Sequence, residues 1–307
     1  MSEPRLDFVM CSSLSGTHRM AYWEWGDPDN DQVLLCVHGL TRTGRDFDAL
    51  AKRLGSHYRV VCPDVVGRGK SDWLIDPAGY VIPQYVADML TLIARINPAR
   101  LDWMGTSMGG LIGLGLAGSL SMSAARRTDR GSFGLASGQT LQLGKFVFND
   151  IGPSLSMDGL GRLAEYVGQF VQFDTFAQAV DYVMSVSPGF GTHTRAQWEF
   201  LTKYVFNQQD GHWIKHYDLR MAEPFARQTG SSVAAAEAIL WASFESIATP
   251  ILLIRGAESD LFPVQVAQAM VARNKHVLFR ELPGVGHAPT FQTDDQIDLV
   301  EQFLLAK

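Results

Sequence analysis

The stretch Gly105-Thr106-Ser107-Met108-Gly109 constrains the fold of this chain more than any other feature. It follows an apolar run at 101–104 and precedes small and apolar residues at 110–117, a composition typical of a helix. A serine flanked by glycines at such a strand-to-helix turn is held exposed on a tight backbone bend. The pattern therefore predicts a nucleophilic Ser107, with the Met108 amide at a helix N-terminus available to bind an oxyanion.

The spacing of the other apolar runs predicts an α/β protein with a doubly wound, mostly parallel sheet. The continuous apolar run at 33–37 has the pattern of a strand that is buried on both faces, and 58–62 is predicted to be the next strand. They alternate with helical spacing at 45–55 and 83–96, as parallel sheets require. Further strands are expected within 6–26 and at 145–148, 250–256 and 277–282, with helices at 263–272 and 294–305.

Two segments interrupt this alternation. Residues 154–240 carry aromatic side chains at helical spacing, and we interpret them as a helical lid over the carboxyl ends of the strands. The core domain would then comprise residues 1–153 and 241–307. The Ser/Gly/Arg-rich segment 119–144 is interpreted as a surface excursion with little chemistry.

Composition excludes several classes of function. The 307 residues are 46% hydrophobic and carry a net charge of −6 without a basic stripe, which argues against a nucleic-acid partner. No signal-peptide pattern and no membrane-spanning apolar run are visible, so we expect a cytoplasmic protein without a membrane partner. The scattered Cys11, Cys36 and Cys62 form neither a disulfide framework nor a metal-ligand pattern.

A serine hydroxyl needs an imidazole base that is itself oriented by a carboxylate. His287 lies in a Gly/Pro loop after the last predicted strand, and Asp260 follows the preceding strand. We therefore predict the catalytic set Ser107, His287 and Asp260. Asp150 also follows a strand end and is the competing acid, with Glu258 as a further alternative.

A second oxyanion donor is expected after the early strand at 33–37. His38-Gly39-Leu40 follows that strand directly, and we assign the Leu40 amide as the partner of the Met108 amide. We expect His38 to shape this loop by hydrogen bonding rather than to transfer protons, and Asp64 to brace a neighbouring loop.

Taken together, these motifs resemble the α/β-hydrolase superfamily from about residue 19 to the C-terminus, apart from 119–144 and the lid. The motifs are His38-Gly39, Asp64-x-x-Gly67-x-Gly69-x-Ser71-Asp72, Gly105-x-Ser107-Met108-Gly109-Gly110, Gly256-x-x-Ser259-Asp260 and Gly286-His287. The order serine, acid, histidine is that of this fold. The resemblance implies an eight-stranded sheet with a helical cap, and ester hydrolysis through an acyl-enzyme with no cofactor.

Residue types narrow the branch. Ser107 stands where members similar to dehalogenases and epoxide hydrolases carry aspartate, and His38-Gly39-Leu40 differs from the His-Gly-Gly-Gly motif of many lipases. The chain looks like small-molecule carboxylesterases, lactonases, perhydrolases and hydrolases of vinylogous diketones. We therefore expect hydrolysis of a small carboxylic ester. A carbon–carbon bond hydrolase and a non-catalytic ligand-binding module are the alternatives.

Substrate contacts are the least constrained by the sequence. Arg42 lies just past the oxyanion loop, where a guanidinium clamps a substrate carboxylate or forms an ordinary ion pair. Trp213, Trp241 and Phe244 are candidates for the wall of an acyl pocket. His212 and His216 have a metal-like spacing if helical, but a third ligand is missing and we expect no metal. The expected partner is a small-molecule substrate, and self-association stays open.

Overall fold

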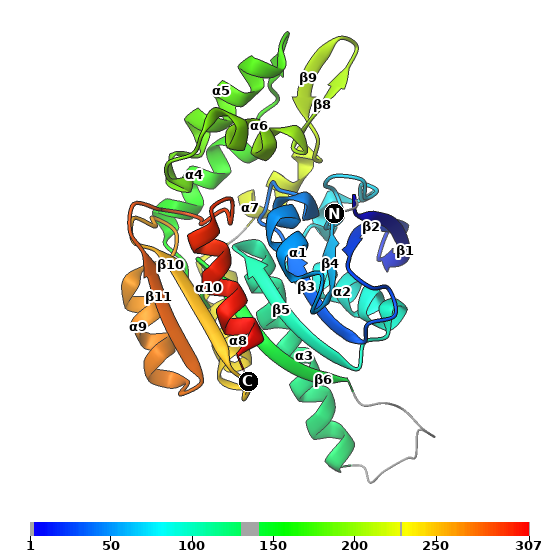
Figure 1. The fold of residues 1–307 in the computed structure, drawn as a ribbon, viewed down its shortest axis with the longest axis vertical. Coiled ribbons are helices and arrows are strands. Elements are labelled where there is room, and N and C mark those ends of the chain that lie inside the picture. The colour runs from blue at the N-terminus through cyan, green and yellow to red at the C-terminus, as the bar shows by residue number, and fades with distance from the viewer. Residues whose placement is uncertain (1–2, 130–140, 228, 307) are drawn as a thin grey trace.

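The computed structural model describes residues 3–129, 141–227 and 229–306. Its centre is an eight-stranded sheet in the order β1-β2-β4-β3-β5-β6-β10-β11 (Figure 1). The strands are β1 (Arg5–Ser13), β2 (Gly16–Trp25), β3 (Gln32–Val37), β4 (Arg59–Pro63), β5 (Arg100–Thr106), β6 (Gln142–Asn149), β10 (Ile251–Gly256) and β11 (Val277–Leu282). β2 runs antiparallel to β1 and β4, and every other neighbouring pair is parallel. The predicted fold class is confirmed.

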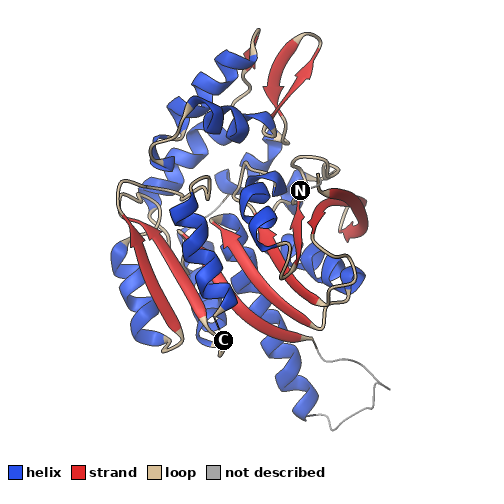
Figure 2. Ribbon diagram, in the orientation of Figure 1, coloured by secondary structure: helices blue, strands red, loops and turns tan. Residues whose placement is uncertain are grey.

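Helices cover both faces of this sheet (Figure 2). Apolar side chains of α1 (Asp48–Leu54) and α10 (Asp294–Leu305) form the core on one face. Those of α2 (Ile82–Ile96), α3 (Met108–Asp129), α8 (Gly230–Glu245) and α9 (Val264–Arg273) form the core on the other. β3 shows why its apolar run is continuous: Leu35 points into one core and Leu34 into the other, and both are fully buried.

The segment between β6 and α8 lies beyond the carboxyl ends of the parallel strands (Figure 1). We call residues 157–226 the cap. It contains α4 (Met157–Val167), β7 (Gln172–Phe173), α5 (Phe176–Val186), α6 (Arg195–Lys203), β8 (Phe206–Gln209), β9 (His212–Lys215) and α7 (Glu223–Ala226). Three of these elements form a small antiparallel sheet in the order β7-β9-β8, which the prediction of a helical lid missed.

A sequence signal for the β8–β9 hairpin was available. Asp210-Gly211 joins the two strands, and both residues have positive φ, 51° and 84°. A two-residue Asp-Gly turn of this kind matches the twist of a hairpin. His212 therefore begins a strand, and the helical spacing that suggested a metal pair with His216 does not exist.

Two further segments differ from the sequence interpretation. α3 continues to Asp129, well into the predicted excursion at 119–144, while residues 130–140 lie outside the described part of the chain. α8 begins at Gly230, inside the predicted lid, but it packs on the core helix α3. A Cβ added to Gly118 of α3 would lie only 2.2 Å from Ser243 Oγ of α8. The two helices therefore pack closely, and the division of the chain into core and lid stays a prediction.

All three cysteines are buried and carry free thiols. Among the described residues, no helix combines the length and the apolar character that crossing a membrane requires.

Candidate active site

The turn that holds Ser107 is built by close backbone packing. β5 ends directly before the serine and α3 begins directly after it. A Cβ on Gly105 would lie 2.4 Å from the Gly109 carbonyl, and a Cβ on Gly109 would lie 1.9 Å from the Val37 carbonyl oxygen. Both positions therefore require glycine. Ser107 itself has a left-handed φ of 52°, the strained conformation expected of a nucleophile on such a turn.

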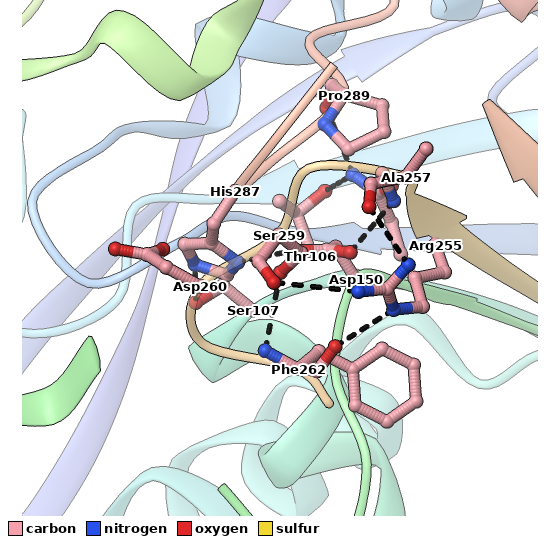
Figure 3. A network of polar contacts seen from close by, with 12 residues as sticks. Thr106, Ser107, Asp150, Arg255, Ala257, Ser259, Asp260, Phe262, His287 and Pro289 are labelled. Carbon is pink, nitrogen blue, oxygen red and sulfur yellow. Dashed lines mark hydrogen bonds and ion pairs between the residues drawn. The ribbon is translucent and has the colours of Figure 1, made fainter. Parts of the chain in front are cut away.

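Three side chains from three strand ends form a continuous hydrogen-bonded chain (Figure 3). His287 Nε2 lies 2.8 Å from Ser107 Oγ, and His287 Nδ1 lies 2.7 Å from Asp150 Oδ2. Because a carboxylate only accepts hydrogen bonds, the contact with Asp150 favours the tautomer with the proton on Nδ1. Nε2 is then left to accept the serine proton.

Asp150 is held by more than the histidine. It follows β6 directly and is fully buried. Its Oδ1 accepts a hydrogen bond from the Gly256 amide at 2.8 Å, and its Oδ2 accepts one from Ser259 Oγ at 2.6 Å. Both donors come from the end of β10 or the loop that follows it, so the neighbouring strand fixes the orientation of this carboxylate.

The prediction that Asp260 contacts His287 is wrong. The Asp260 side chain is 48% exposed and forms an ion pair with Arg162 of α4, with Nη2 2.9 Å from Oδ1. Burial alone would raise the pKa of Asp260, but the Arg162 guanidinium lowers it below its usual range. Asp150, the competing acid in the sequence analysis, occupies the position beside the imidazole. The loop after β10 presents Ser259 to that carboxylate, while Asp260 faces the cap.

The two amides predicted to bind an oxyanion, those of Leu40 and Met108, make no hydrogen bond to an acceptor within the described residues. A Cβ on Gly39 would lie 3.7 Å from the Ser107 Cβ, so the early loop lies against the serine. Fully buried Arg68 links the two donor residues, with Nε 2.9 Å from the Leu40 carbonyl oxygen and Nη2 3.4 Å from Met108 Sδ. The assignment of both amides stays a prediction.

His38 and Asp64 hold the surrounding loops, as expected. His38 Nδ1 lies 2.7 Å from the Gly39 carbonyl oxygen, and its Nε2 accepts from the Val65 amide at 2.9 Å. Burial lowers the pKa of His38 to about 3, so it stays neutral and does not exchange protons near neutral pH. Asp64 accepts from the Gly44 amide at 2.8 Å, and burial raises its pKa to about 6.

Ser107 and His287 line a cavity of about 70 Å³, which we call the catalytic cavity. Leu40 lines it from the core, and Arg162, Tyr166 and Phe190 line it from the cap. Both guanidinium groups in its wall already have carboxylate partners. Arg42 is bidentate to Asp46, with both N–O distances 2.7 Å, and also donates to the Leu201 carbonyl. Arg42 thus forms the ordinary ion pair that the sequence left open. A carbon–carbon bond hydrolase that binds its substrate acid through Arg42 is therefore no longer favoured.

The aromatic residues chosen from the sequence lie elsewhere, so the prediction that they wall this cavity is wrong. Trp213 packs on Phe176 within the cap, with ring centroids 4.8 Å apart. Trp241 Nε1 donates to Ser154 Oγ at 2.9 Å, and Phe244 is fully buried in the core beneath α8. All three side chains pack in the hydrophobic interior or against neighbouring elements. Arg162 and Tyr166 of α4 also line the cavity but were not predicted, because no sequence pattern marks which side of α4 faces the serine.

Comparison with known proteins identifies the family to which this fold belongs. The sequence profile of the alpha/beta hydrolase family matches residues 34–299. A 3-hydroxybutyrate-oligomer hydrolase from Cupriavidus necator is 50% identical over 306 residues, covering 98% of both chains. A pimeloyl-[acyl-carrier protein] methyl ester esterase from Xanthomonas axonopodis pv. citri is 27% identical, covering 89% of this chain and 95% of that one. Among solved structures, an alpha/beta hydrolase from Novosphingobium aromaticivorans has a TM-score of 0.80 and 32% identity over 99% of both chains.

These likenesses and the fold place the chain in a class of proteins. The protein belongs to the α/β-hydrolase family. It is an enzyme, a carboxylic ester hydrolase, and the non-catalytic binding module considered from the sequence is set aside.

Proposed function

We propose that this enzyme is a serine hydrolase that cleaves short oligomers of 3-hydroxybutyrate, or closely similar hydroxyacid esters, through an acyl-enzyme intermediate. The observation that carries the mechanism is the hydrogen-bonded chain from Ser107 Oγ through His287 to Asp150. The observation that supports the substrate class is the likeness to the Cupriavidus necator hydrolase over nearly the whole of both chains.

In the first half of the reaction, Ser107 Oγ attacks the ester carbonyl carbon while His287 Nε2 takes the serine proton. The carbonyl oxygen becomes an oxyanion, which the Leu40 and Met108 amides bind. His287 then passes its proton to the oxygen of the departing alcohol as the carbon–oxygen bond breaks. Asp150 keeps the imidazole in the required tautomer and stabilises the imidazolium.

In the second half, a water molecule takes the place of the alcohol. His287 Nε2 accepts a proton from this water, whose oxygen attacks the acyl carbon. Collapse of the second oxyanion breaks the bond to Ser107 Oγ, and the proton returns to the serine. The net change is addition of one water across one ester bond.

The test compares the wild type with Ser107→Ala on a 3-hydroxybutyrate dimer and on 4-nitrophenyl butyrate. We expect turnover of both substrates by the wild type and a loss of kcat of about 10⁵–10⁶-fold in the variant, as for other hydrolases of this mechanism. Ser187→Ala is the matched control, because Ser187 lines the same cavity without contacting His287. It should change kcat less than about tenfold.

A serine-reactive phosphonate gives a readout that does not depend on the substrate. It should label the wild type on the peptide that carries Ser107 and leave Ser107→Ala unlabelled. Undiminished ester turnover by Ser107→Ala would contradict the mechanism. Serine-dependent turnover of nitrophenyl esters with none of the dimer would contradict the substrate class alone.

A further inference from the structure

A second cavity adjoins the catalytic cavity and extends into the cap. Its volume is about 50 Å³, room for several water-sized groups since each takes about 10–15 Å³. Arg42, Tyr166 and Phe190 line both cavities, so the two are neighbours in one depression. We call this second space the cap cavity. A substrate that reaches beyond the serine on this side would enter it.

Lys215, the last residue of β9, lines the cap cavity and is only 8% exposed. Its Nζ donates to the Tyr166 carbonyl at 2.7 Å and to the Gln169 carbonyl at 2.9 Å. An ammonium has three donors, so one N–H remains without a partner among the described residues. The ammonium also lies 5.4 Å from the ring centroid of Tyr182 and 5.6 Å from that of Tyr217.

Charge balance distinguishes Lys215 from the other cations of the two cavities. Arg42 is paired with Asp46, and Arg162 is paired with Asp260. Lys215 has no carboxylate partner, and no aspartate or glutamate is among the described residues that line the cap cavity. A buried charge without a counter-ion is costly. Consistent with this cost, burial lowers the pKa of Lys215 to about 8.

A second donor without an acceptor lies in the wall of the same cavity. The Tyr182 hydroxyl is buried and makes no hydrogen bond within the described residues. Buried hydroxyl groups in proteins normally have a partner, and each exception needs an explanation. An ammonium donor and a hydroxyl donor that both lack an acceptor fit the two oxygens of a carboxylate.

We propose that Lys215 and Tyr182 bind the free carboxylate of the substrate, which makes the cap cavity the subsite for the acid end of a hydroxyacid oligomer. This proposal rests on the function proposed above. It assigns Lys215 as a determinant of specificity for acids over neutral esters. The two hydrogen bonds that Lys215 already makes fix its ammonium between α4 and the small sheet of the cap.

The chemistry of the oligomer gives this subsite a direction. In a hydroxyacid oligomer, the unit with the free carboxylate is joined to the rest through its own hydroxyl oxygen. That unit is therefore the alcohol part of the last ester bond. Binding its carboxylate in the cap cavity presents this bond to Ser107. The bond from the carbonyl carbon to the alkoxy oxygen breaks, the oxygen takes the proton from His287, and one hydroxyacid leaves while the remaining chain stays on the serine.

Binding separates this role from a purely structural one. In a Ser107→Ala background, we would measure by calorimetry the Kd of the 3-hydroxybutyrate dimer and of the same dimer with its terminal carboxylate converted to a primary amide. We expect the acid to bind about 10–100-fold more tightly than the amide. Lys215→Met should abolish this preference. Lys203→Met, which removes an exposed cap lysine, should retain it.

Two further variants cover a Lys215→Met protein that fails to fold. Tyr182→Phe removes a hydroxyl that holds no partner, so the protein should stay folded while the preference for the acid falls about 2–10-fold. Lys215→Arg keeps the charge and should retain part of the preference. Equal affinity for acid and amide in the Ser107→Ala protein would overturn the proposal, as would an unchanged preference in both Lys215→Met and Tyr182→Phe.

The preference should also depend on pH. Lys215 is charged below about pH 8 in the free enzyme, so the ratio of acid to amide affinity should fall as the pH rises from 7 to 9. The other titratable groups that line the cap cavity keep their charge across this range. Burial raises the pKa of Tyr166, Tyr182 and Tyr217, and the charged Arg42 is already paired with Asp46. Burial also lowers the pKa of the adjacent His216, which stays neutral.

The outcomes distinguish this proposal from the one it rests on. Serine-dependent hydrolysis of 4-nitrophenyl butyrate and of the dimer, with no change in the acid preference in Lys215→Met, would leave the proposed function standing and remove the subsite. If the wild type shows no serine-dependent turnover of either ester, the proposed function is wrong. The binding comparison would still decide whether the cap cavity selects a carboxylate.

Discussion

The ends of β6 and β10 carry two aspartates whose surroundings differ sharply. Asp150, after β6, is fully buried and accepts hydrogen bonds from Gly256, Ser259 and His287. Asp260, after β10, is about half exposed and pairs with Arg162 of the cap. Both follow a strand of the same sheet, and both lie between the serine and the histidine in the chain. Both strand ends bring an aspartate near His287. The hydrogen-bond donors around each aspartate decide which of the two faces the imidazole.

The loop after β10 determines which of the two aspartates faces His287. It contributes two donors to Asp150, the Gly256 amide and the Ser259 hydroxyl, so the loop that was expected to supply the acid supports the acid of its neighbour. Ser259 Oγ also accepts from the Phe262 amide at 3.1 Å, which fixes its direction. This arrangement makes predictions that separate the two strand ends.

The largest effect is expected from Asp150→Asn. An amide in this position keeps the size of the side chain but favours the wrong imidazole tautomer, so we expect kcat to fall about 10⁴-fold. KM should change little, because Asp150 is not among the residues that line the catalytic cavity. Steady-state kinetics on 4-nitrophenyl butyrate checks this, and a kcat within about tenfold of the wild type would contradict the assignment.

An intermediate effect is expected from Ser259→Ala. The substitution removes one of the hydrogen bonds to Asp150 and leaves those from the Gly256 amide and from His287. We expect kcat to fall about 10–30-fold, which corresponds to one lost hydrogen bond to a charged group at the low end of its range. Ser259→Thr retains the hydroxyl and serves as the matched control. Activity equal to the wild type in Ser259→Ala would show that Gly256 alone orients the carboxylate.

The smallest effect is expected from Asp260→Asn and from Arg162→Gln. The pair is partly exposed, so each variant should change the free energy of unfolding by about 0–1 kcal/mol. kcat should stay within about threefold of the wild type, since the hydrogen bonds of His287 go to Asp150 and Ser107 and not to this pair. Denaturant unfolding and kinetics measured on the same preparations check both statements. A loss of kcat above 100-fold in Asp260→Asn would return the role of the acid to the β10 loop.

The sequence was sufficient to predict the fold class and the proximity of Ser107 and His287, because each depends on a local pattern. Gly105 packs against the backbone of Gly109, and Gly109 packs against the backbone of Val37. Such close contacts require glycine and are therefore visible in the sequence. The choice between Asp150 and Asp260 depends on partners that are distant in the chain: Ser259 lies 109 residues from Asp150, and Arg162 lies 98 residues from Asp260. No local pattern records such a contact.

The cap was harder to predict for a related reason. Phe176 and Trp213 are conspicuous aromatic residues of the cap, but they pack within its hydrophobic core, and their presence does not reveal which face meets the substrate. Lys215 carries no motif at all. Only the Asp210-Gly211 turn indicated a hairpin there, and the direction of the lysine follows from the register of that hairpin.

The most direct test of the account is the kcat of the double variant Asp150→Asn/Asp260→Asn beside each single variant, on one nitrophenyl ester. If Asp150 alone orients His287, the double variant should be as slow as Asp150→Asn within about threefold, since Asp260 would have no role left to lose. A double variant at least tenfold slower than Asp150→Asn would show that Asp260 acts as a second acid. That result would contradict the assignment of the β6 aspartate as the sole partner of the catalytic histidine.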